Sequence, residues 1–360
     1  MKLLYITNGI NGAGGLERVL SIKASYLAEH YNYDVTILSL NENHLNPFYE
    51  FSDKINMVSI PVTGNMVKYI FSYKQGIKAI VDKIKPDVIS VCDDGLKGFF
   101  IPKIVKTKAY IVYERHVSKL IEEKSNHGYV SSLTVKAKWW LMSCLAKEFS
   151  KFIVLTEGNR EEWKSLNNLE VMPNPLSFYP NQSSPLDSNK VICIGKISYQ
   201  KGQDLLLKAW DLLFEKHPDW KLELYGYAND DFLNVSDLSK KNIHYFPPEK
   251  NIMEKYLESS IYVMSSRYEG FGMVLTEAMA CGVPCVSFNC NYGPADIIHE
   301  EVDGFLVEKE NIEELASRIS KLIDNDNLRQ KMGANAKINV ARFAPEKIVE
   351  QWDELFTKLK

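Results

Sequence analysis

Short apolar runs alternate with longer amphipathic stretches along the chain. In the first half the runs are rich in β-branched and aromatic residues and are apolar at almost every position, which is typical of strands buried on both faces of a parallel sheet. They cover 2–7, 34–40, 87–92, 109–114 and 151–156. Helical periodicity lies between several of them, at 15–30 and 74–84. The pattern predicts a doubly wound α/β domain.

The alternation stops at 171–189, a segment with four prolines and many Asn and Ser residues, which we interpret as an interdomain linker. It then restarts, with strands predicted at 190–195, 221–226, 242–246, 261–266 and 284–289. Helices are predicted at about 202–216, 250–259, 272–281 and 311–323. Two such series predict two Rossmann-like domains that face a central cleft, with ligands at the carboxyl ends of the strands.

The domain boundaries follow from this organisation. We expect an N-terminal domain at 1–175 and a C-terminal domain at 176–343, since 360 residues exceed what one hydrophobic core usually organises. The last segment, 344–360, is amphipathic and begins with Pro345 near the first helical turn. We expect this helix to pack back on the N-terminal domain.

Composition favours a soluble protein in a reducing compartment. No apolar stretch is long enough to span a membrane, and "MKLLYIT" leads directly into a strand without the features of a signal peptide. Of the six cysteines only Cys281, Cys285 and Cys290 cluster, and their spacing fits no zinc motif. We therefore expect reduced, packed thiols and a cytoplasmic location, with peripheral contact at the cytoplasmic membrane face as an extension.

The net charge of −3 is unevenly distributed. Residues 1–175 carry 22 Lys and Arg against 18 Asp and Glu, whereas the remainder carries 21 against 28. Within 51–150 the count is 16 against 9. This basic region suits an anionic membrane surface or a phosphorylated acceptor. Because the whole chain is mildly acidic, we do not expect nucleic acid as a partner.

The segment 136–152 is the clearest candidate for a membrane contact. Its periodicity predicts a helix with Trp139, Met142, Ala146 and Phe149 on one face. Core packing is the first interpretation of that face. The alternative is a peripheral membrane face that uses Trp139, Trp140 and the nearby lysines.

The glycines after the first strand suggest a phosphate site, although not a dinucleotide fold. Gly12 and Gly14 begin a GxGxxG pattern, but Glu17 occupies the last position. The second strand ends without the acidic residue that binds a ribose, which disfavours a dehydrogenase. Gly14 and Gly15 nevertheless lead into a helix whose free N–H groups bind phosphate. The alternative is that they only shape a tight turn.

The second domain contains two further segments that could bind a phosphate. In "GKISYQKGQDLLLKAW", Lys196 and Lys201 flank a short loop before Gly202, where two ammonium groups would neutralise a diphosphate. In "SSRYEGFGMVLTEAMACGVP", Glu269 and Glu277 stand on either side of a predicted helix start. Consecutive backbone N–H groups of Gly270, Phe271 and Gly272 would there form an anion-binding entrance.

The stretch "YEGFGMVLTEAMACGVPCV" resembles the Glu–seven-residues–Glu signature of the retaining glycosyltransferases of family 4, which have the GT-B fold. Four further blocks resemble that family in the same order: "GGLERVLSIKASYLAEHYNYDVTILS", "VMPNPLS", "VICIGKISYQKGQDLLLKAW" and "YGPADIIHEEVDGFLVE". The resemblance covers nearly the whole chain. It implies a nucleotide-sugar donor bound mainly by the C-terminal domain and an acceptor on the N-terminal domain.

The resemblance also implies roles for individual residues. Glu277 would bind the ribose hydroxyls and Glu269 the hydroxyls of the donor sugar, while His116 would contact that sugar from the N-terminal domain. Lys196 stands where the family often has arginine, so its charge is kept but the bidentate fork is lost. The implied donor-binding set is Gly14, Gly15, Lys196, Lys201, Phe246, Glu269, Gly270, Phe271, Gly272, Met273, Val274 and Glu277. The implied catalytic set is Glu269, Lys196, Lys201 and His116. On the acceptor side we expect Arg115, His116 and Asp94. Asp94 is included because it closes a strand, and the alternative for it is a solvated turn.

Sugar transfer requires stabilisation of the leaving diphosphate, which lysines and helix N-termini provide without a metal or other cofactor. The Asp-Asn-Asp of 324–326 lies between two helical runs, so we interpret it as a set of helix caps. With retention of configuration, which the resemblance implies, we favour front-face attack over a nucleophilic Glu269.

The predicted function is hexosyl transfer from a nucleotide-diphosphate sugar to a glycan or lipid-linked glycan of a bacterial-type capsule, lipopolysaccharide or other surface polysaccharide. A UDP-sugar of the galactose or N-acetylgalactosamine type is favoured because "FNCNYGPADII" resembles members that use such donors. The alternatives are a GDP-mannose-dependent transferase, a nucleotide-sugar epimerase or hydrolase on the same fold, and a non-catalytic binding module.

Overall fold

The computed structural model describes residues 1–43, 47–119, 129–228, 232 and 241–360. These residues form two compact units, Met1–Ser177 with Pro345–Lys360, and Phe178–Ala344. The sequence-based boundary between 175 and 176 lies two residues before this division, and the last helix belongs to the first unit. No helix among the described residues combines the length and apolarity needed to cross a membrane.

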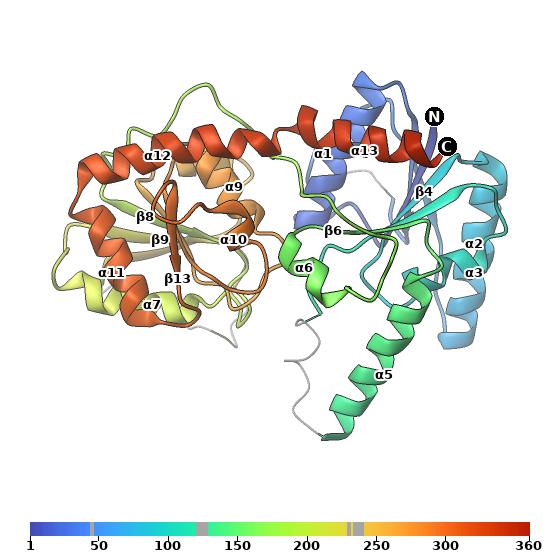
Figure 1. Cartoon of the computed structure of the whole chain (residues 1–360), viewed down its shortest axis with the longest axis horizontal. Helices are drawn as coiled ribbons and strands as arrows, with labels where there is room; N and C mark the ends of the chain where they lie inside the picture. The colour runs from blue at the N-terminus through green and yellow to red at the C-terminus, as the bar shows by residue number, and fades with distance from the viewer. Residues whose placement is uncertain (44–46, 120–128, 229–231, 233–240) are drawn as a thin grey trace. The chain divides into compact units, whose positions relative to one another are not determined.

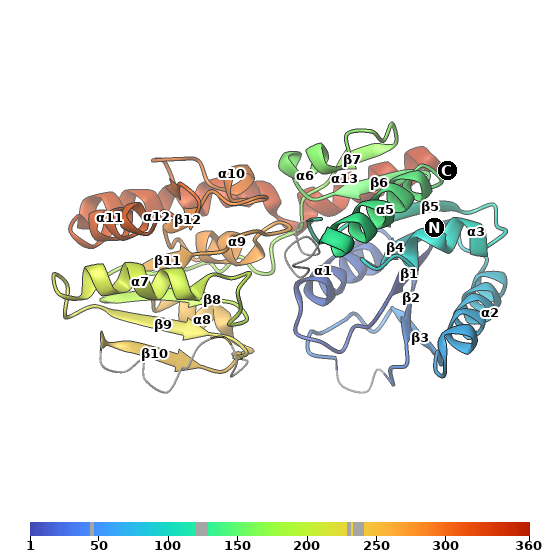
Figure 2. The same ribbon diagram turned by 90° about the horizontal axis from the view of Figure 1, so that it is seen from below.

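The first unit contains a parallel sheet with the strand order β3-β2-β1-β4-β5-β6-β7. Figure 2 shows these strands side by side. They are β1 (Lys2–Thr7), β2 (Asp34–Leu40), β3 (Asn56–Ile60), β4 (Val88–Cys92), β5 (Tyr110–Glu114), β6 (Lys151–Val154) and β7 (Leu169–Val171). Its described helices are α1 (Gly15–His30), α2 (Met66–Ile84), α3 (Ile101–Ile104), α5 (Tyr129–Ala146), α6 (Glu157–Glu162) and α13 (Pro345–Leu359).

Both faces of this sheet are covered, which explains the continuous apolar character of its strands. On one face Leu4 and Ile6 of β1 join a core with Tyr73 and Ile77 of α2, a core that also includes residues of α3 and α5. On the other face lies α1, which packs against α13. The prediction that the last segment returns to the N-terminal domain agrees with this contact.

The second unit is built in the same way around a six-stranded parallel sheet with the order β10-β9-β8-β11-β12-β13 (Figure 1). Its strands are β8 (Lys190–Ile194), β9 (Lys221–Tyr225), β10 (Ile243–Phe246), β11 (Ile261–Met264), β12 (Cys285–Phe288) and β13 (Gly304–Val307). Its helices are α7 (Gln203–Phe214), α8 (Ile252–Leu257), α9 (Met273–Ala280), α10 (Pro294–Ile297), α11 (Ile312–Ile323) and α12 (Asp326–Val340).

In each sheet the order in which strands are added changes side at the first strand of the unit: the early strands lie on one side of it and the later strands on the other. The neighbours of β1 are β2 and β4, and those of β8 are β9 and β11. Loops that follow such neighbouring strands diverge and leave room for a ligand at the carboxyl edge of a doubly wound sheet. The predicted ligand loops follow β1 and β5 in the first unit, and β8 and β11 in the second.

Two of the predicted helices have different bounds in the structure. The helix predicted at 136–152 ends at Ala146, and its last predicted residues belong to a turn and to β6. Ser150 donates its N–H to the carbonyl oxygen of Ile111, so the backbone there already enters the sheet. The helix predicted at 74–84 begins eight residues earlier, at Met66, where the Asn65 side chain caps it by accepting the N–H of Lys68.

Candidate active site

The loops after β8 and β11 bring together the two lysine- and glutamate-bearing segments of the second unit. The two strands are parallel neighbours, so their carboxyl ends lie at the same edge of the sheet. After β8 the chain passes Lys196 and Lys201 and enters α7 at Gly202, which has a φ of 63°. A Cβ at Gly202 would clash with the carbonyl oxygen of Ser265, so glycine lets the two loops approach closely.

Lys201 and Glu269 form an ion pair at this edge. Lys201 Nζ lies 2.7 Å from Glu269 Oε1, and the side chains are 23% and 7% exposed. Ser266 Oγ donates to the same carboxylate oxygen at 2.5 Å. Burial alone would lower the pKa of Lys201, but the charge of Glu269 and its hydrogen bond outweigh burial and raise that pKa. The ammonium is therefore charged and partly open to solvent.

Several hydrogen bonds fix this pair by joining the two loops. Arg267 makes a bidentate contact with Asp204 in the first turn of α7, at 2.8 and 2.6 Å. It also donates to the carbonyl oxygen of Tyr199 at 2.7 Å. Gln200 Nε2 donates to the carbonyl oxygen of Tyr268, and Ser265 Oγ donates to that of Lys201. Sequence reasoning did not identify Arg267, since only the fold brings it to Asp204.

The segment Gly270-Phe271-Gly272 opens α9 as predicted. The Phe271 side chain is buried against Phe343, with the ring centroids 5.5 Å apart, so only its backbone is available to a ligand. Gly272 is the N-cap with a φ of 98°, and Met273 and Val274 supply the first helical N–H groups. Groups at this position have no intrahelical acceptor and favour an anion. The geometry is that of an anion-binding helix start.

Glu277 lies one helical turn inside α9 and is almost fully buried. Its Oε2 is 3.3 Å from the hydroxyl of Tyr256, which belongs to α8 and also donates to the carbonyl oxygen of Val274. Glu269 and Glu277 thus have different surroundings. Glu269 meets a lysine at the sheet edge, whereas Glu277 lies between two helices.

The two remaining predicted donor residues of this unit lie on either side of the same edge. Lys196 is exposed, and its ammonium has no ion pair or hydrogen bond with the residues that the structure describes. Phe246, at the end of β10, is 36% exposed and stacks on Tyr225 with the ring centroids 4.8 Å apart. Phe246 belongs to the predicted donor-binding set, and its exposed ring offers a flat apolar surface.

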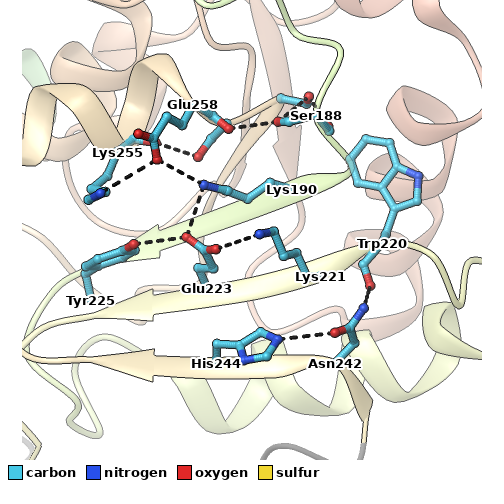
Figure 3. A network of polar contacts seen from close by, with 12 residues as sticks. Ser188, Lys190, Trp220, Lys221, Glu223, Tyr225, Asn242, His244, Lys255 and Glu258 are labelled. Atoms are coloured by element: carbon cyan, nitrogen blue, oxygen red, sulfur yellow. Dashed lines mark hydrogen bonds and ion pairs between the residues drawn. The ribbon is translucent and has the colours of Figure 1, made fainter.

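A polar network around Glu223 includes the hydroxyl of Tyr225, as Figure 3 shows. Glu223 accepts from the Tyr225 hydroxyl at 3.0 Å and lies 3.4 Å from Lys190 Nζ and 3.2 Å from Lys221 Nζ. Burial would raise the pKa of Glu223, but Lys190, the Tyr225 hydroxyl and Lys221 together lower it. Lys190 also reaches Glu258 at the end of α8, so the network holds β8, β9 and α8 together.

The first unit contains a different arrangement around His116. Glu114, at the end of β5, pairs with Lys23 of α1 and accepts from Ser90 Oγ at 2.5 Å. His116 Nε2 lies 3.3 Å from Glu114 Oε2, the carboxylate oxygen that also contacts Lys23. The Lys23 ammonium is also 3.8 Å from the ring centroid of Trp352, in α13. Burial would raise the pKa of Glu114, but Lys23 and His116 lower it to about 2.

Asp94 and Arg115, predicted on the acceptor side, are held by each other. Arg115 Nη1 donates to the Asp94 carbonyl oxygen at 2.7 Å, and Asp94 Oδ1 accepts the backbone N–H of His116 at 3.1 Å. The Arg115 side chain is buried and lies over the ring of Trp139. The guanidinium thus supports the loop of Asp94 from inside, and its role as an acceptor contact stays a prediction. Asp94 itself remains partly exposed.

Gly14 is the N-cap of α1, and Gly15 is its first residue. The Glu17 carboxylate lies beside Gly12 and Gly14, at the place where a side chain on either glycine would extend. Burial is the main cause of a raised pKa at Glu17, and the charge of Glu42 adds to it. Glu17 lies in the first turn of α1, where a carboxylate interacts favourably with the helix dipole. From the sequence we expected a phosphate at this helix start and did not anticipate that Glu17 lies there.

The structure separates the two tryptophans of the proposed membrane face. Trp139 is 8% exposed and belongs to the core with Met142, Ala146 and Phe149, whereas Trp140 is 70% exposed. The core interpretation of that helical face is therefore correct. The Asp-Asn-Asp segment acts as predicted, since Asn325 caps α12 by accepting the N–H of Leu328 at 2.9 Å. All six cysteines are free, and only Cys144 is exposed.

Among the described residues, Cys92, Glu114 and His116 place potential metal-ligand atoms within 4.8 Å of one another. They do not suit a divalent cation. The Glu114 carboxylate already pairs with the Lys23 ammonium, and burial raises the pKa of the Cys92 thiol, which keeps it protonated. We therefore interpret this cluster as an internal charge network.

Known families match both units. The model "Glycosyl transferases group 1" matches residues 178–339, and "Glycosyl transferase 4-like" matches residues 16–136. A Haemophilus influenzae "uncharacterized glycosyltransferase" is 28% identical, over 98% of both chains. The "amylovoran biosynthesis glycosyltransferase AmsD" of Erwinia amylovora is also 28% identical, over 98% of this chain and 99% of its own. The "lipopolysaccharide 1,6-galactosyltransferase" of Salmonella typhimurium is 20% identical, over 91% and 90%.

Solved structures match the fold over the whole length. Anabaena HepE in complex with UDP-glucose has a TM-score of 0.76 at 18% identity, over 99% of this chain and 100% of its own. A mutant of S. aureus TarM in a complex that contains UDP has a TM-score of 0.76 at 16% identity, over 99% of both chains. With the family matches to both units and this agreement of fold, the chain belongs to the glycosyltransferases of GT-B fold.

Proposed function

We propose that this glycosyltransferase transfers a hexose with retention of configuration from a UDP-sugar to a growing bacterial surface glycan or its lipid-linked precursor. The observation that carries the proposal is the Lys201–Glu269 pair beside the entrance of α9. A cation, a carboxylate and free backbone N–H groups are the partners that a diphosphate and the sugar attached to it require.

The residues at this edge of the sheet are assigned to the diphosphate and to the sugar of the donor. Lys201, with Lys196, stabilises the charge that develops on the leaving diphosphate. Glu269 binds hydroxyls of the transferred sugar. Its carboxylate lies next to the Lys201 ammonium, which fits a donor in which the sugar is bonded directly to the phosphate. The N–H groups of Gly272, Met273 and Val274 bind diphosphate oxygens. Neither step requires a metal ion.

Glu277 and Phe246 are assigned to the nucleoside. Carboxylates accept hydrogen bonds from two adjacent hydroxyl groups, so Glu277 suits the ribose. The exposed ring of Phe246 borders the base, whose polar edge meets backbone groups at the end of β10. The assignment of Glu277 also follows from the Glu–seven-residues–Glu resemblance.

The first unit is assigned to the acceptor, with His116 and Asp94 as the contacting residues and Gly14 and Gly15 as donors to phosphate. Glu114 holds the imidazole of His116 in place through Nε2. We favour front-face attack, in which the acceptor hydroxyl passes its proton to the leaving phosphate as the new glycosidic bond forms. We place the reaction in the cytoplasm.

The UDP-sugar donor is favoured because structures similar in fold contain UDP or UDP-glucose, and because relatives in the comparison are named for polysaccharide or lipopolysaccharide sugar transfer. A galactose-type sugar is our first candidate. A thermal-shift panel of UDP, GDP, ADP and their sugars tests this choice. Stabilisation by UDP and UDP-galactose is expected. Stabilisation by GDP-mannose alone would instead identify GDP-mannose as the donor.

Turnover assays distinguish transfer from the other reactions considered. With the stabilising sugar nucleotide, release of the nucleotide should depend on an acceptor and should persist in excess EDTA. Hydrolysis or epimerisation at full rate without an acceptor would contradict transfer. Binding without any turnover in single-turnover mixtures would indicate a non-catalytic module.

The two glutamates provide the sharpest test of the assigned roles. Glu277→Gln should weaken UDP binding by roughly 10- to 100-fold, because a charged hydrogen-bond acceptor contributes about 1.5–3 kcal/mol. Glu269→Gln should lower turnover by roughly 100-fold while UDP binding changes little. Calorimetry with UDP and initial rates under donor saturation measure the two effects. The reverse pattern would overturn both assignments.

A further inference from the structure

The first turns of α2 carry an apolar surface that the core of the unit does not use. Met66, Val67, Ile70 and Phe71 are 80%, 77%, 59% and 60% exposed, respectively. They follow one another at the spacing that puts side chains on one side of a helix. We call these four residues the α2 apolar surface. Both views show α2 next to α3 along its unit (Figures 1 and 2).

The opposite face of α2 accounts for its packing. Tyr73, Ile77 and Val81 are buried in the core of the unit. The helix start is well formed, because Asn65 caps it. The exposed apolar residues therefore belong to a regular helix that is already anchored by its other face, and a large exposed apolar patch of this kind marks an interaction site.

The charge around the α2 apolar surface is of one sign. Residues 54–81 contain four lysines and no Asp or Glu. Lys74 lies four residues after Ile70 and three after Phe71, and Lys78 follows one turn later, so both continue the apolar side of the helix. Lys68, Lys74 and Lys78 are exposed. An apolar turn followed by lysines on the same side is the pattern of a helix that lies in a membrane interface.

We propose that α2 binds the surface of an anionic lipid bilayer, with the α2 apolar surface in the acyl boundary and Lys74 and Lys78 at the head groups. A second copy of this chain fits less well. In a symmetric dimer the same patch would face itself, and its lysines would be brought together without acidic partners. Four side chains are also few for a stable protein interface, which involves roughly 20–30 residues a side.

This site replaces the Trp139–Trp140 pair as the predicted membrane contact. Trp139 lies in the core, so of the two tryptophans only Trp140 is exposed. The α2 apolar surface offers four exposed side chains on one helix and a basic extension. The inference does not depend on which sugar is transferred, since vesicle binding is measured without a sugar donor.

Co-sedimentation of the full chain with vesicles tests the proposal. Vesicles of phosphatidylcholine with phosphatidylglycerol should bind the protein at low salt, and vesicles of phosphatidylcholine alone should bind it much less. The double variant Ile70→Ser/Phe71→Ser should bind the anionic vesicles at least about tenfold less tightly. The variant Lys74→Gln/Lys78→Gln should also bind less tightly and lose part of the salt dependence.

The matched control is Trp140→Ser, which removes one exposed aromatic side chain from another helix and should leave vesicle binding unchanged. Circular dichroism and UDP-induced thermal stabilisation should be the same in all variants, because the changed side chains are exposed. Absence of binding by the wild-type chain would overturn the proposal. So would equal binding by the Ile70→Ser/Phe71→Ser variant, or a solution dimer that this variant converts to a monomer without any vesicle binding.

Discussion

Each unit holds a lysine–glutamate pair near the carboxyl edge of its sheet, but the two pairs differ in their access to solvent. Lys23 and Glu114 of the first unit are 0% and 1% exposed, whereas Lys201 and Glu269 of the second are 23% and 7% exposed. Lys23 is also covered by Trp352 of α13. One pair is closed inside its unit, and the other is open to an incoming ligand.

The difference shows that an ion pair has different uses at different depths. Desolvation of a buried pair consumes much of its Coulombic attraction, so such a pair mainly fixes one arrangement of the elements that carry it. Lys23–Glu114 joins α1 to β5 and orients His116. At an open edge the lysine keeps a solvated side, so an anionic ligand can share it. We therefore expect the first pair to govern folding and the second to govern activity.

The largest expected effect belongs to the closed pair. Glu114→Gln leaves the Lys23 ammonium buried without its counter-ion, which should lower the free energy of unfolding by about 3–5 kcal/mol. Urea unfolding at neutral pH measures the loss. The double variant Lys23→Met/Glu114→Gln removes both charges and should recover much of it. If the double variant were as unstable as the sum of both single variants, the pair would not be coupled.

The pH dependence of stability follows from the same carboxylate. Because the pKa of Glu114 is lowered from its ordinary 4.5 to about 2, its ionised form stabilises the folded chain fully above about pH 4.5. This contribution is lost as the pH falls from 4.5 towards 2. The stability difference between the wild-type chain and Glu114→Gln should thus be constant above pH 4.5 and shrink below it. A difference that grew on acidification would contradict the assignment.

The open pair should affect turnover more than stability. Lys201→Gln removes the cation that we assign to the leaving diphosphate and should reduce turnover by roughly 10²–10³-fold. Since Ser266 still donates to Glu269 and the pair is partly exposed, the unfolding free energy should change by only about 1 kcal/mol. Lys196→Gln, at the exposed lysine of the same loop, should reduce turnover less. Equal activity of the Lys201→Gln variant would remove this lysine from the catalytic set.

The sequence singled out both residues of the open pair but not their contact, and it did not single out the closed pair. Lys201 and Glu269 lie in loops after strands, where glycines and a recognisable signature mark the chemistry. Lys23 lies inside an amphipathic helix and pairs with a residue 91 positions away. No local pattern shows that a lysine is buried, because its partner and its cover come from β5 and α13. Arg267 was missed for the same reason.

The fold was predicted where elements have one clear period. The two sheets and the return of the last helix follow from continuous apolar runs and a single amphipathic stretch. The edge strands β3, β7 and β13 were missed because they are short, and because polar residues interrupt the apolar pattern of β3 and β7. The start of α2 was missed because its first turns are apolar on the exposed side as well, which hides the helical period. The exposed apolar residues that hide the period are those of the α2 apolar surface, which we propose as the membrane site.

The smallest expected effect extends the comparison to an exposed pair. Lys151 Nζ lies 2.8 Å from Glu170 Oε2 across β6 and β7, and the side chains are 34% and 39% exposed. Glu170→Gln should change the unfolding free energy by about 0–1 kcal/mol, because solvent screens the pair and Lys151 stays hydrated when it is unpaired. Urea unfolding beside Glu114→Gln makes the contrast direct, since each variant removes one charge without changing side-chain size. A loss of several kcal/mol at Glu170 would show that depth does not determine what an ion pair contributes in this chain.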